Sequence, residues 1–193
     1  MVSAAYTKDS AYAKDSAQPA APNPSRKPTS LARAREVAES VPDPELPLLT
    51  LADLGILRDV SVDGPCVTVW LTPTYSGCPA MHEMRRDLTA RLMAAGFLVV
   101  DVRTLLNPPW SSDLISAEGR AKLAAAGIAP PRSNPKATNA PVPLTLFATG
   151  PPVTCPACGS LDTRRTAAFS GTACKDLHRC LACGEPFEHV KEI

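Results

Sequence analysis

The sequence lacks long apolar runs, a strong net charge and an apolar block near its start. No stretch approaches the ~18–20 uninterrupted apolar residues of a membrane helix, and residues 1–22 contain no apolar block of the kind found in a secretory signal. The 20 Lys and Arg residues nearly balance the 19 Asp and Glu residues, so no broad electrostatic field attracts nucleic acid or anionic lipid. These absences predict a cytoplasmic protein with neither a membrane nor a nucleic acid as partner.

Two signatures of redox catalysis are also missing. A di-iron carboxylate centre needs Glu-x-x-His pairs on long helices, and the sequence contains none. It also lacks the glycine-rich phosphate loop that a flavin or nicotinamide reductase normally carries. Neither an oxygen-activating subunit nor a reductase is therefore expected, and no catalytic residue is assigned.

The sequence does contain seven cysteines, four of them in two CxxC pairs. In a reducing compartment such pairs indicate metal binding or thiol chemistry more than disulfides. Their spacing is typical of a zinc ribbon, and four thiolates complete a tetrahedral Zn²⁺ shell at ~2.3 Å. The predicted metal ligands are Cys155, Cys158, Cys180 and Cys183.

The role expected for this metal is structural. Residues 153–193 are too few for a hydrophobic core of their own, and metal ligation then supplies most of the folding free energy. Four cysteine ligands leave no open coordination position, which disfavours a catalytic metal. Because thiolates also accept iron, a rubredoxin-like iron site or a transient cluster site stays open. Strands are expected at 163–169 and 175–179.

A second candidate site is the loop 72–79, which joins a predicted strand to a predicted helix. Pro79 suits the first helical turn, so Cys78 is expected beside free backbone N–H groups at the positive end of the helix dipole. That position lowers a thiol pKa and suits a soft-metal ligand or a nucleophile. The alternative is a small buried hydrophobe at a helix cap. The residues expected to support Cys78 are Thr72, Thr74, Ser76 and Gly77.

The remaining cysteines and the histidines receive weaker assignments. His82 lies four residues after Cys78 and could join Asp43 or Glu83 in a Cys–His–acid arrangement, but a solvent-facing helix position is favoured. Cys174 is interpreted either as a turn residue of the ribbon or as a spare thiolate beside Lys175. The side chains expected to be structural are Cys66, His178 and His189.

Hydrophobic patterning predicts an α+β fold with a small mixed sheet and helices on one side. Apolar spacing indicates helices at 31–40, 81–95 and 116–126, and strands at 56–62, 67–71 and 97–104. The strand–helix–strand order makes part of the sheet parallel. The chain is divided into a disordered tail at 1–30, a domain at 31–130, a proline-rich linker at 131–152 with a short strand at 144–147, and the ribbon at 153–193.

Several motifs resemble those of a known family. Asp43-Pro44-Glu45, Asp53-Leu54-Gly55, the loop 72–79 and Asn107-Pro108-Pro109-Trp110 resemble the iron–sulfur assembly domain of SufT-like proteins. Residues 115–123 and 127–131 narrow the match, as do 170–175 and 180–187 in the ribbon. Together they resemble the PaaD family, the D components of phenylacetyl-CoA epoxidase systems. The resemblance covers residues 31–193.

The resemblance implies an accessory protein of aerobic phenylacetate degradation. It would assemble or deliver an iron or iron–sulfur centre to the phenylacetyl-CoA epoxidase system, with Cys78 matching the family's reactive cysteine. The implied partners are the oxygenase and reductase components, and a homodimer is left open. The implied cofactors are structural Zn²⁺ and a transient iron ion or iron–sulfur cluster.

Two other functions are weighed beside this one. The first is a non-catalytic scaffold that binds the oxygenase components through its zinc ribbon. The second is a nucleic-acid-binding ribbon, which the balanced charge of residues 151–193 disfavours because phosphate binding needs a basic surface.

Overall fold

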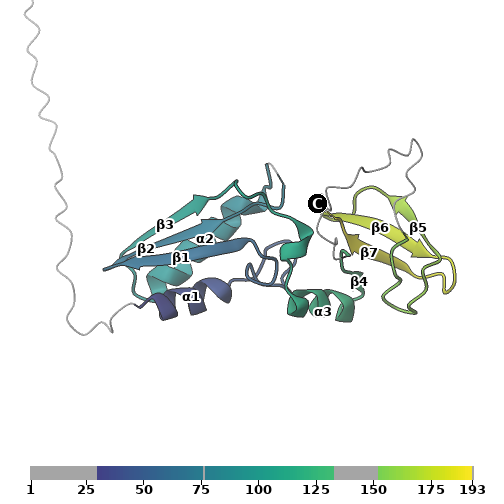
Figure 1. Cartoon of the computed structure of the whole chain (residues 1–193), viewed down its shortest axis with the longest axis horizontal. Coiled ribbons are helices and arrows are strands. Elements are labelled where there is room, and N and C mark those ends of the chain that lie inside the picture. The colour runs from purple at the N-terminus through teal and green to yellow at the C-terminus, as the bar shows by residue number, and fades with distance from the viewer. Residues whose placement is uncertain (1–29, 76, 133–151, 193) are drawn as a thin grey trace, which may run out of the picture.

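The computed structural model describes residues 30–75, 77–132 and 152–192, which form two β-sheets and three α-helices (Figure 1). The expected tail at 1–30, except for Ser30, lies outside the described residues. So do Ser76, the strand expected at 144–147 and nearly all of the expected linker.

The first sheet has three strands in the order β1-β2-β3. β1 (Leu57–Asp63) and β2 (Cys66–Leu71) are antiparallel, whereas β2 and β3 (Val99–Thr104) are parallel. Gly64 turns the hairpin between β1 and β2 with a φ of 55°, a left-handed conformation that glycine adopts without steric cost. The mixed sheet predicted from the strand–helix–strand order is confirmed.

Two helices cover one face of this sheet. α1 (Leu31–Glu39) packs along β1, α2 (Ala80–Ala94) packs along β3, and the helices contact each other. Met84, Leu88 and Leu92 recur every four residues along α2 and are buried, as the apolar stripe of an amphipathic helix should be. They join the apolar residues of the sheet in one core. The helix positions follow the predicted ranges closely.

A short segment after β3 connects the first sheet to the second. It contains a 3₁₀ turn, η1 (Ser112–Leu114), then α3 (Ala117–Ala125) and the two-residue strand β4 (Ile128–Ala129). The Ser116 hydroxyl caps α3 by accepting a 2.9 Å hydrogen bond from the Gly119 N–H. Asp53 holds the start of α3 in place, because its backbone carbonyl accepts from the Ser116 N–H at 2.8 Å.

The second sheet has the order β4-β7-β6-β5. β5 (Thr163–Ala167), β6 (Lys175–Cys180) and β7 (Pro186–Val190) form an antiparallel ribbon, and β4 adds to its edge parallel to β7. The sequence did not predict β4. Through this strand, the last segment of the first domain becomes part of the ribbon sheet. Figure 1 shows α3 and β4 between the two sheets.

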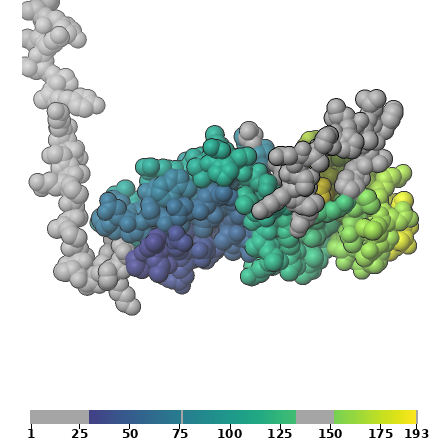
Figure 2. Space-filling model, viewed as in Figure 1, coloured from purple at the N-terminus to yellow at the C-terminus, as the bar shows by residue number. Residues whose placement is uncertain are grey.

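The fold is α+β, as predicted, and its C-terminal sheet carries the four-cysteine group. Within the described ranges, no helix is both long enough and apolar enough to cross a membrane. In the space-filling view the first domain and the ribbon meet through the α3–β4 region (Figure 2).

Candidate metal centres

The four-cysteine group is built from two loops with the same backbone geometry. Each loop ends on a glycine of positive φ, Gly159 at 74° and Gly184 at 81°. Each of these glycines donates its N–H to the carbonyl of the first cysteine of its pair, at 2.9 and 3.0 Å. The turn therefore folds back on itself and directs both sulfurs of each pair to one point. The four predicted ligands come together there: Cys155, Cys158, Cys180 and Cys183.

The spacing of the sulfurs fits a tetrahedral metal. Four thiolates at the zinc distance of ~2.3 Å would lie about 3.8 Å apart. The Sγ atoms of Cys155 and Cys183 are 3.9 Å apart, and those of Cys158 and Cys180 are 3.6 Å apart. Cys155 and Cys180 are buried whereas the other two are exposed. The donor set and its geometry therefore fit a closed structural zinc site.

The four thiols hold their protons unequally. The backbone N–H groups of Cys183 and Ala182 stabilise the thiolate and lower the pKa of Cys180 to about 7. The Ser160 N–H favours ionisation of Cys158, but hydrogen bonds with the neighbouring sulfurs outweigh it and raise the pKa of Cys158 to about 12. Crowded sulfurs cannot all ionise alone, so a divalent cation is needed to bring the remaining thiols to the thiolate state.

A second cluster on the ribbon was not predicted. One Asp176 carboxylate oxygen lies 3.1 Å from His178 Nε2 and 2.9 Å from His189 Nδ1. All three side chains are buried, and their ligand atoms lie close enough together to hold a metal ion. His178 also stacks on Phe187. The two histidines therefore form a polar centre inside the ribbon, where the sequence predicted structural side chains.

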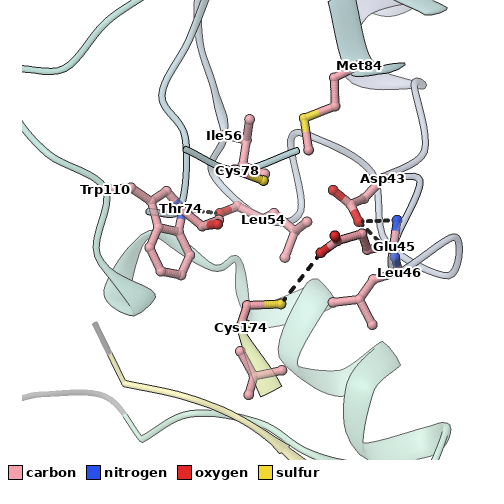
Figure 3. A pocket seen from close by; sticks show the side chains of 11 residues that line it. Asp43, Glu45, Leu46, Leu54, Ile56, Thr74, Cys78, Met84, Trp110 and Cys174 are labelled. Atoms are coloured by element: carbon pink, nitrogen blue, oxygen red, sulfur yellow. Dashed lines mark hydrogen bonds between the residues drawn. The ribbon is translucent and has the colours of Figure 1, made fainter. Parts of the chain in front are cut away.

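Cys78 lies in a pocket between the first domain and the ribbon (Figure 3). Asp43 and Glu45 enter from the loop between α1 and β1, and Cys78 enters from the start of α2. Cys174, immediately before β6, supplies a second thiol from the ribbon. The cavity of about 20 Å³ has room for one water-sized ligand. The full lining is Asp43, Glu45, Leu46, Leu54, Ile56, Thr74, Cys78, Met84, Trp110, Cys174 and Val190.

The expectation that the helix start lowers the Cys78 pKa is wrong. Burial raises the pKa of the Cys78 thiol, and the carboxylates of Glu45 and Asp43 raise it further. The N–H groups of Ala80 and Met81 act in the predicted direction but are outweighed. The helix start does lower the pKa of Cys78, but burial and the nearby carboxylates raise it by more. The thiol is half-buried and reaches the pocket, so it is not sealed in the hydrocarbon core.

The residues expected to support Cys78 have different positions. Thr74 lines the pocket, whereas Thr72 is buried and its hydroxyl has no hydrogen-bond partner among the described residues. Gly77 turns the loop with a φ of 84°. The sequence analysis assigned no role at the site to Trp110, which it named only within a motif. In the structure it closes one wall of the pocket and donates its indole N–H to the Leu54 carbonyl at 2.8 Å.

The alternative Cys–His–acid arrangement is not assembled. His82 is exposed, as the favoured solvent-facing position predicted, and lines a different surface hollow of α2, beside Arg85 and Arg86. Asp43 does share a pocket with Cys78, but His82 is not among the residues that line it. Cys66 is half-buried at the start of β2, also away from the pocket.

The fold and the cysteines define a class of protein: a small α+β domain joined to a four-cysteine ribbon. Residues 32–102 match the family described as iron–sulfur cluster assembly protein. Residues 139–191 match the PaaD zinc beta ribbon domain. A relative from Escherichia coli (strain K12), named as a putative 1,2-phenylacetyl-CoA epoxidase subunit, is 38% identical over 153 residues, covering 79% of this chain and 87% of the relative. The chain belongs to the PaaD family.

Two solved structures are similar to about half of this chain. A domain of unknown function, DUF59, from Bacillus anthracis is 27% identical, with a TM-score of 0.44, and covers 48% of this chain and 89% of its own. A conserved hypothetical protein from Thermotoga maritima is also 27% identical, with a TM-score of 0.43, covering 50% and 96%. The family membership rests on the sequence matches alone.

Proposed function

We propose that this chain is an accessory protein of a phenylacetyl-CoA epoxidase system that assembles or delivers an iron or iron–sulfur centre. Cys78 transiently holds the cargo, and the oxygenase and reductase components receive it. The four ribbon cysteines hold a structural Zn²⁺. Enzymatic turnover by this chain itself is not part of the proposal.

The single observation that carries this proposal is the position of Cys78. Its sulfur lies in a pocket that also contains the carboxylates of Asp43 and Glu45. Thiolate and carboxylate are iron ligands, and the partial exposure of the thiol gives cargo a way in and out. The match of residues 32–102 to iron–sulfur cluster assembly proteins and the epoxidase name of the relative support the cargo and the client.

The experiment compares anaerobically purified wild-type protein with Cys78→Ala and with Cys66→Ala. Cys66 is the matched control, because it is also half-buried in the same domain but does not line the pocket. Iron, sulfide and zinc are measured in each protein, and iron is measured in the reductase component produced in the same cells. We expect Cys78→Ala to lose its iron and to lower the iron content of the reductase several-fold. Zinc content should be unchanged in all three proteins.

Normal iron loading of the reductase with Cys78→Ala would contradict the proposal. It would favour a second candidate function, in which the chain is a scaffold that binds the oxygenase components through its ribbon. The observation in favour of that scaffold is the exposure of three large apolar side chains on the ribbon: Leu161, Phe169 and Leu181, which are 58%, 65% and 54% exposed. Co-purification that depends on these residues and not on Cys78 would support it.

A further inference from the structure

The buried cluster of Asp176, His178 and His189 is the feature of the ribbon that the four cysteines do not explain. Asp176 and His178 are two residues apart on β6, so both side chains project from the same face of the sheet. His189 on β7 is the direct cross-strand partner of Asp176, and the side chains of such a pair lie on one face. The strand register therefore brings the three side chains together.

The cluster is enclosed by protein. Asp176, His178 and His189 are 5%, 7% and 4% exposed. Phe187 stacks on His178, and Ala129 of β4 is matched to His189 on the other side of β7. A carboxylate and two imidazoles in such a place lose most of their hydration, which costs free energy unless their polar atoms find partners.

Asp176 has no ammonium or guanidinium partner among the described residues. Its ion-pair contacts are with the two imidazoles alone. Lys175, which precedes it on β6, pairs with Glu188 at 2.7 Å. A neutral imidazole donates a hydrogen bond but supplies no charge. The buried carboxylate therefore has metal-binding neighbours and no side chain of permanent positive charge to neutralise it.

The outer ring nitrogens do not complete a hydrogen-bond network. His178 Nδ1 and His189 Nε2 are buried and have no hydrogen-bond partner among the described residues. An oxygen of Glu192 lies 4.0 Å from His189 Nε2, which favours the tautomer with its proton on that nitrogen. In that neutral ring, Nδ1 presents a lone pair to the Asp176 oxygen 2.9 Å away. Two lone pairs at this separation repel each other unless a cation lies between them.

From these contacts we propose that Asp176, His178 and His189 form a second metal site of the ribbon, which takes a divalent transition-metal ion, Zn²⁺ or Fe²⁺. The three ligand atoms lie close enough together to hold one ion. The Asp176 oxygen is 3.1 Å from His178 Nε2 and 2.9 Å from His189 Nδ1. Two ligands at right angles on an ion with bonds of ~2.1 Å lie ~3.0 Å apart. Imidazole ligands select such ions over Mg²⁺ and Ca²⁺, which prefer oxygen.

This site is separate from the four-cysteine group and from the Cys78 pocket. His178 precedes Cys180 by two residues on β6, a separation of about 6.6 Å along a strand, so one ion cannot bind both sets of ligands. None of the three residues lines the pocket, so the inference does not depend on the proposed function. The ion would join β6 to β7 beside β4, the strand that the first domain adds to the ribbon sheet.

The test counts metal ions in the untagged full-length chain, with zinc already in the four-cysteine group. All proteins carry Cys78→Ala, so that the pocket adds no metal. Zn²⁺ and Fe²⁺ are titrated anaerobically in separate arms against a chromophoric chelator, and the arm with the tighter binding identifies the ion. We expect the parent chain to bind one further ion, and Asp176→Asn and His189→Gln to bind it more than about tenfold more weakly. His82→Gln is the matched control, because it changes an exposed histidine of α2, and should match the parent.

Cobalt locates the further ion by the kind of ligand. Co²⁺ bound to thiolates absorbs strongly through charge transfer, whereas nitrogen and oxygen ligands give only weak visible bands. One equivalent of Co²⁺ added to the zinc-loaded parent should therefore produce weak bands without charge-transfer absorption. Asp176→Asn should lose these bands, and excess Mg²⁺ should not displace the ion from the parent.

Each other outcome overturns the proposal. If the parent binds no further ion, the cluster is held by hydrogen bonds alone, with a protonated His189 between Asp176 and Glu192. Equal binding by the parent and both variants would reveal an adventitious ion only. Retained zinc verifies that the four-cysteine group of a variant is folded. Should both variants lose it, the parent and His82→Gln decide: weak cobalt bands in both support the site, and charge-transfer absorption or no binding overturns it.

Discussion

The first domain and the ribbon are held together by different forces. The first domain has a continuous apolar core drawn from α1, α2 and strands of its sheet. The separate buried cluster of the ribbon is small, and two of its members, Cys155 and Cys180, are predicted metal ligands. Burial of apolar surface therefore stabilises the first domain, whereas we expect the fold of the ribbon to depend on a bound metal.

The cysteines of the two regions differ in the same way. The ribbon quartet is already gathered around one point, so its sulfurs are committed to each other. Cys78 and Cys174 instead belong to different domains and face a pocket. A sulfur that holds structure must not exchange its metal, whereas a sulfur that carries cargo must. Under the proposed function, the ribbon quartet would be of the first kind and Cys78 of the second.

The largest difference in stability between the two regions should appear when zinc is removed. A strong chelator should unfold the ribbon, because structural zinc contributes on the order of 10 kcal/mol in small modules, and should leave the first domain folded. Hydrogen exchange followed by mass spectrometry measures this directly. Protection should vanish from β5, β6 and β7 and persist in α2 and β2. Simultaneous loss in both regions would mean that the first domain needs the ribbon to fold.

A substitution in the apolar core should destabilise the first domain and leave zinc binding by the ribbon unchanged. Leu88 is fully buried in α2, so Leu88→Ala should lower the free energy of unfolding of the first domain by about 2–5 kcal/mol. Urea unfolding followed by tryptophan fluorescence reports this domain, because Trp70 and Trp110 both lie in it. Zinc content should not change. The control Leu181→Ala, at an exposed ribbon position, should stay within about 0.5 kcal/mol of wild type.

The smallest expected effect concerns Asp53, which holds α3 in place between the two sheets. Burial alone would raise the pKa of Asp53, but the Thr50 N–H and the Lys122 ammonium outweigh it and hold the pKa below its ordinary value. Asp53→Asn should therefore cost about 2 kcal/mol at neutral pH. The folded-state pKa is lower than the unfolded one, so this stabilisation exists above the unfolded value of ~3.9 and is lost as the pH falls through the folded value.

Urea unfolding of wild type and Asp53→Asn at a series of pH values checks that prediction. The difference in the free energy of unfolding should shrink as the pH falls below about 4. Glu118→Gln is the matched control, because Glu118 pairs with the same Lys122 at 2.9 Å but is exposed. Exposed pairs contribute little, so the control should lie close to wild type. A constant difference across the pH range would show that the Asp53 charge is not responsible.

The sequence predicted the elements whose signals are local. The four-residue spacing of Met84, Leu88 and Leu92 located α2, and the CxxC spacing located the ribbon ligands. β4 escaped prediction because a two-residue strand has no periodicity of its own. Its pairing with β7 joins residues about sixty positions apart, and only the folded chain brings them together.

The candidate site shows the same division. Cys78 was proposed as a site residue from its loop and its place before a helix, which are local features. The direction of its pKa was predicted wrongly, because burial and the carboxylates of the loop around Asp43 and Glu45 set it. The place of Cys174 beside Glu45 depends on how two domains dock. No pattern within the ribbon sequence carries that information.

The parallel pairing of β4 with β7 has a consequence for the pocket that the two domains enclose. Ile128 and Ala129 are matched to Glu188 and His189 across the ribbon edge, so backbone hydrogen bonds join the last strand of the first domain to the ribbon sheet. This pairing fixes the separation of the two domains, and with it the distance of Cys174 from the opposite wall of the pocket.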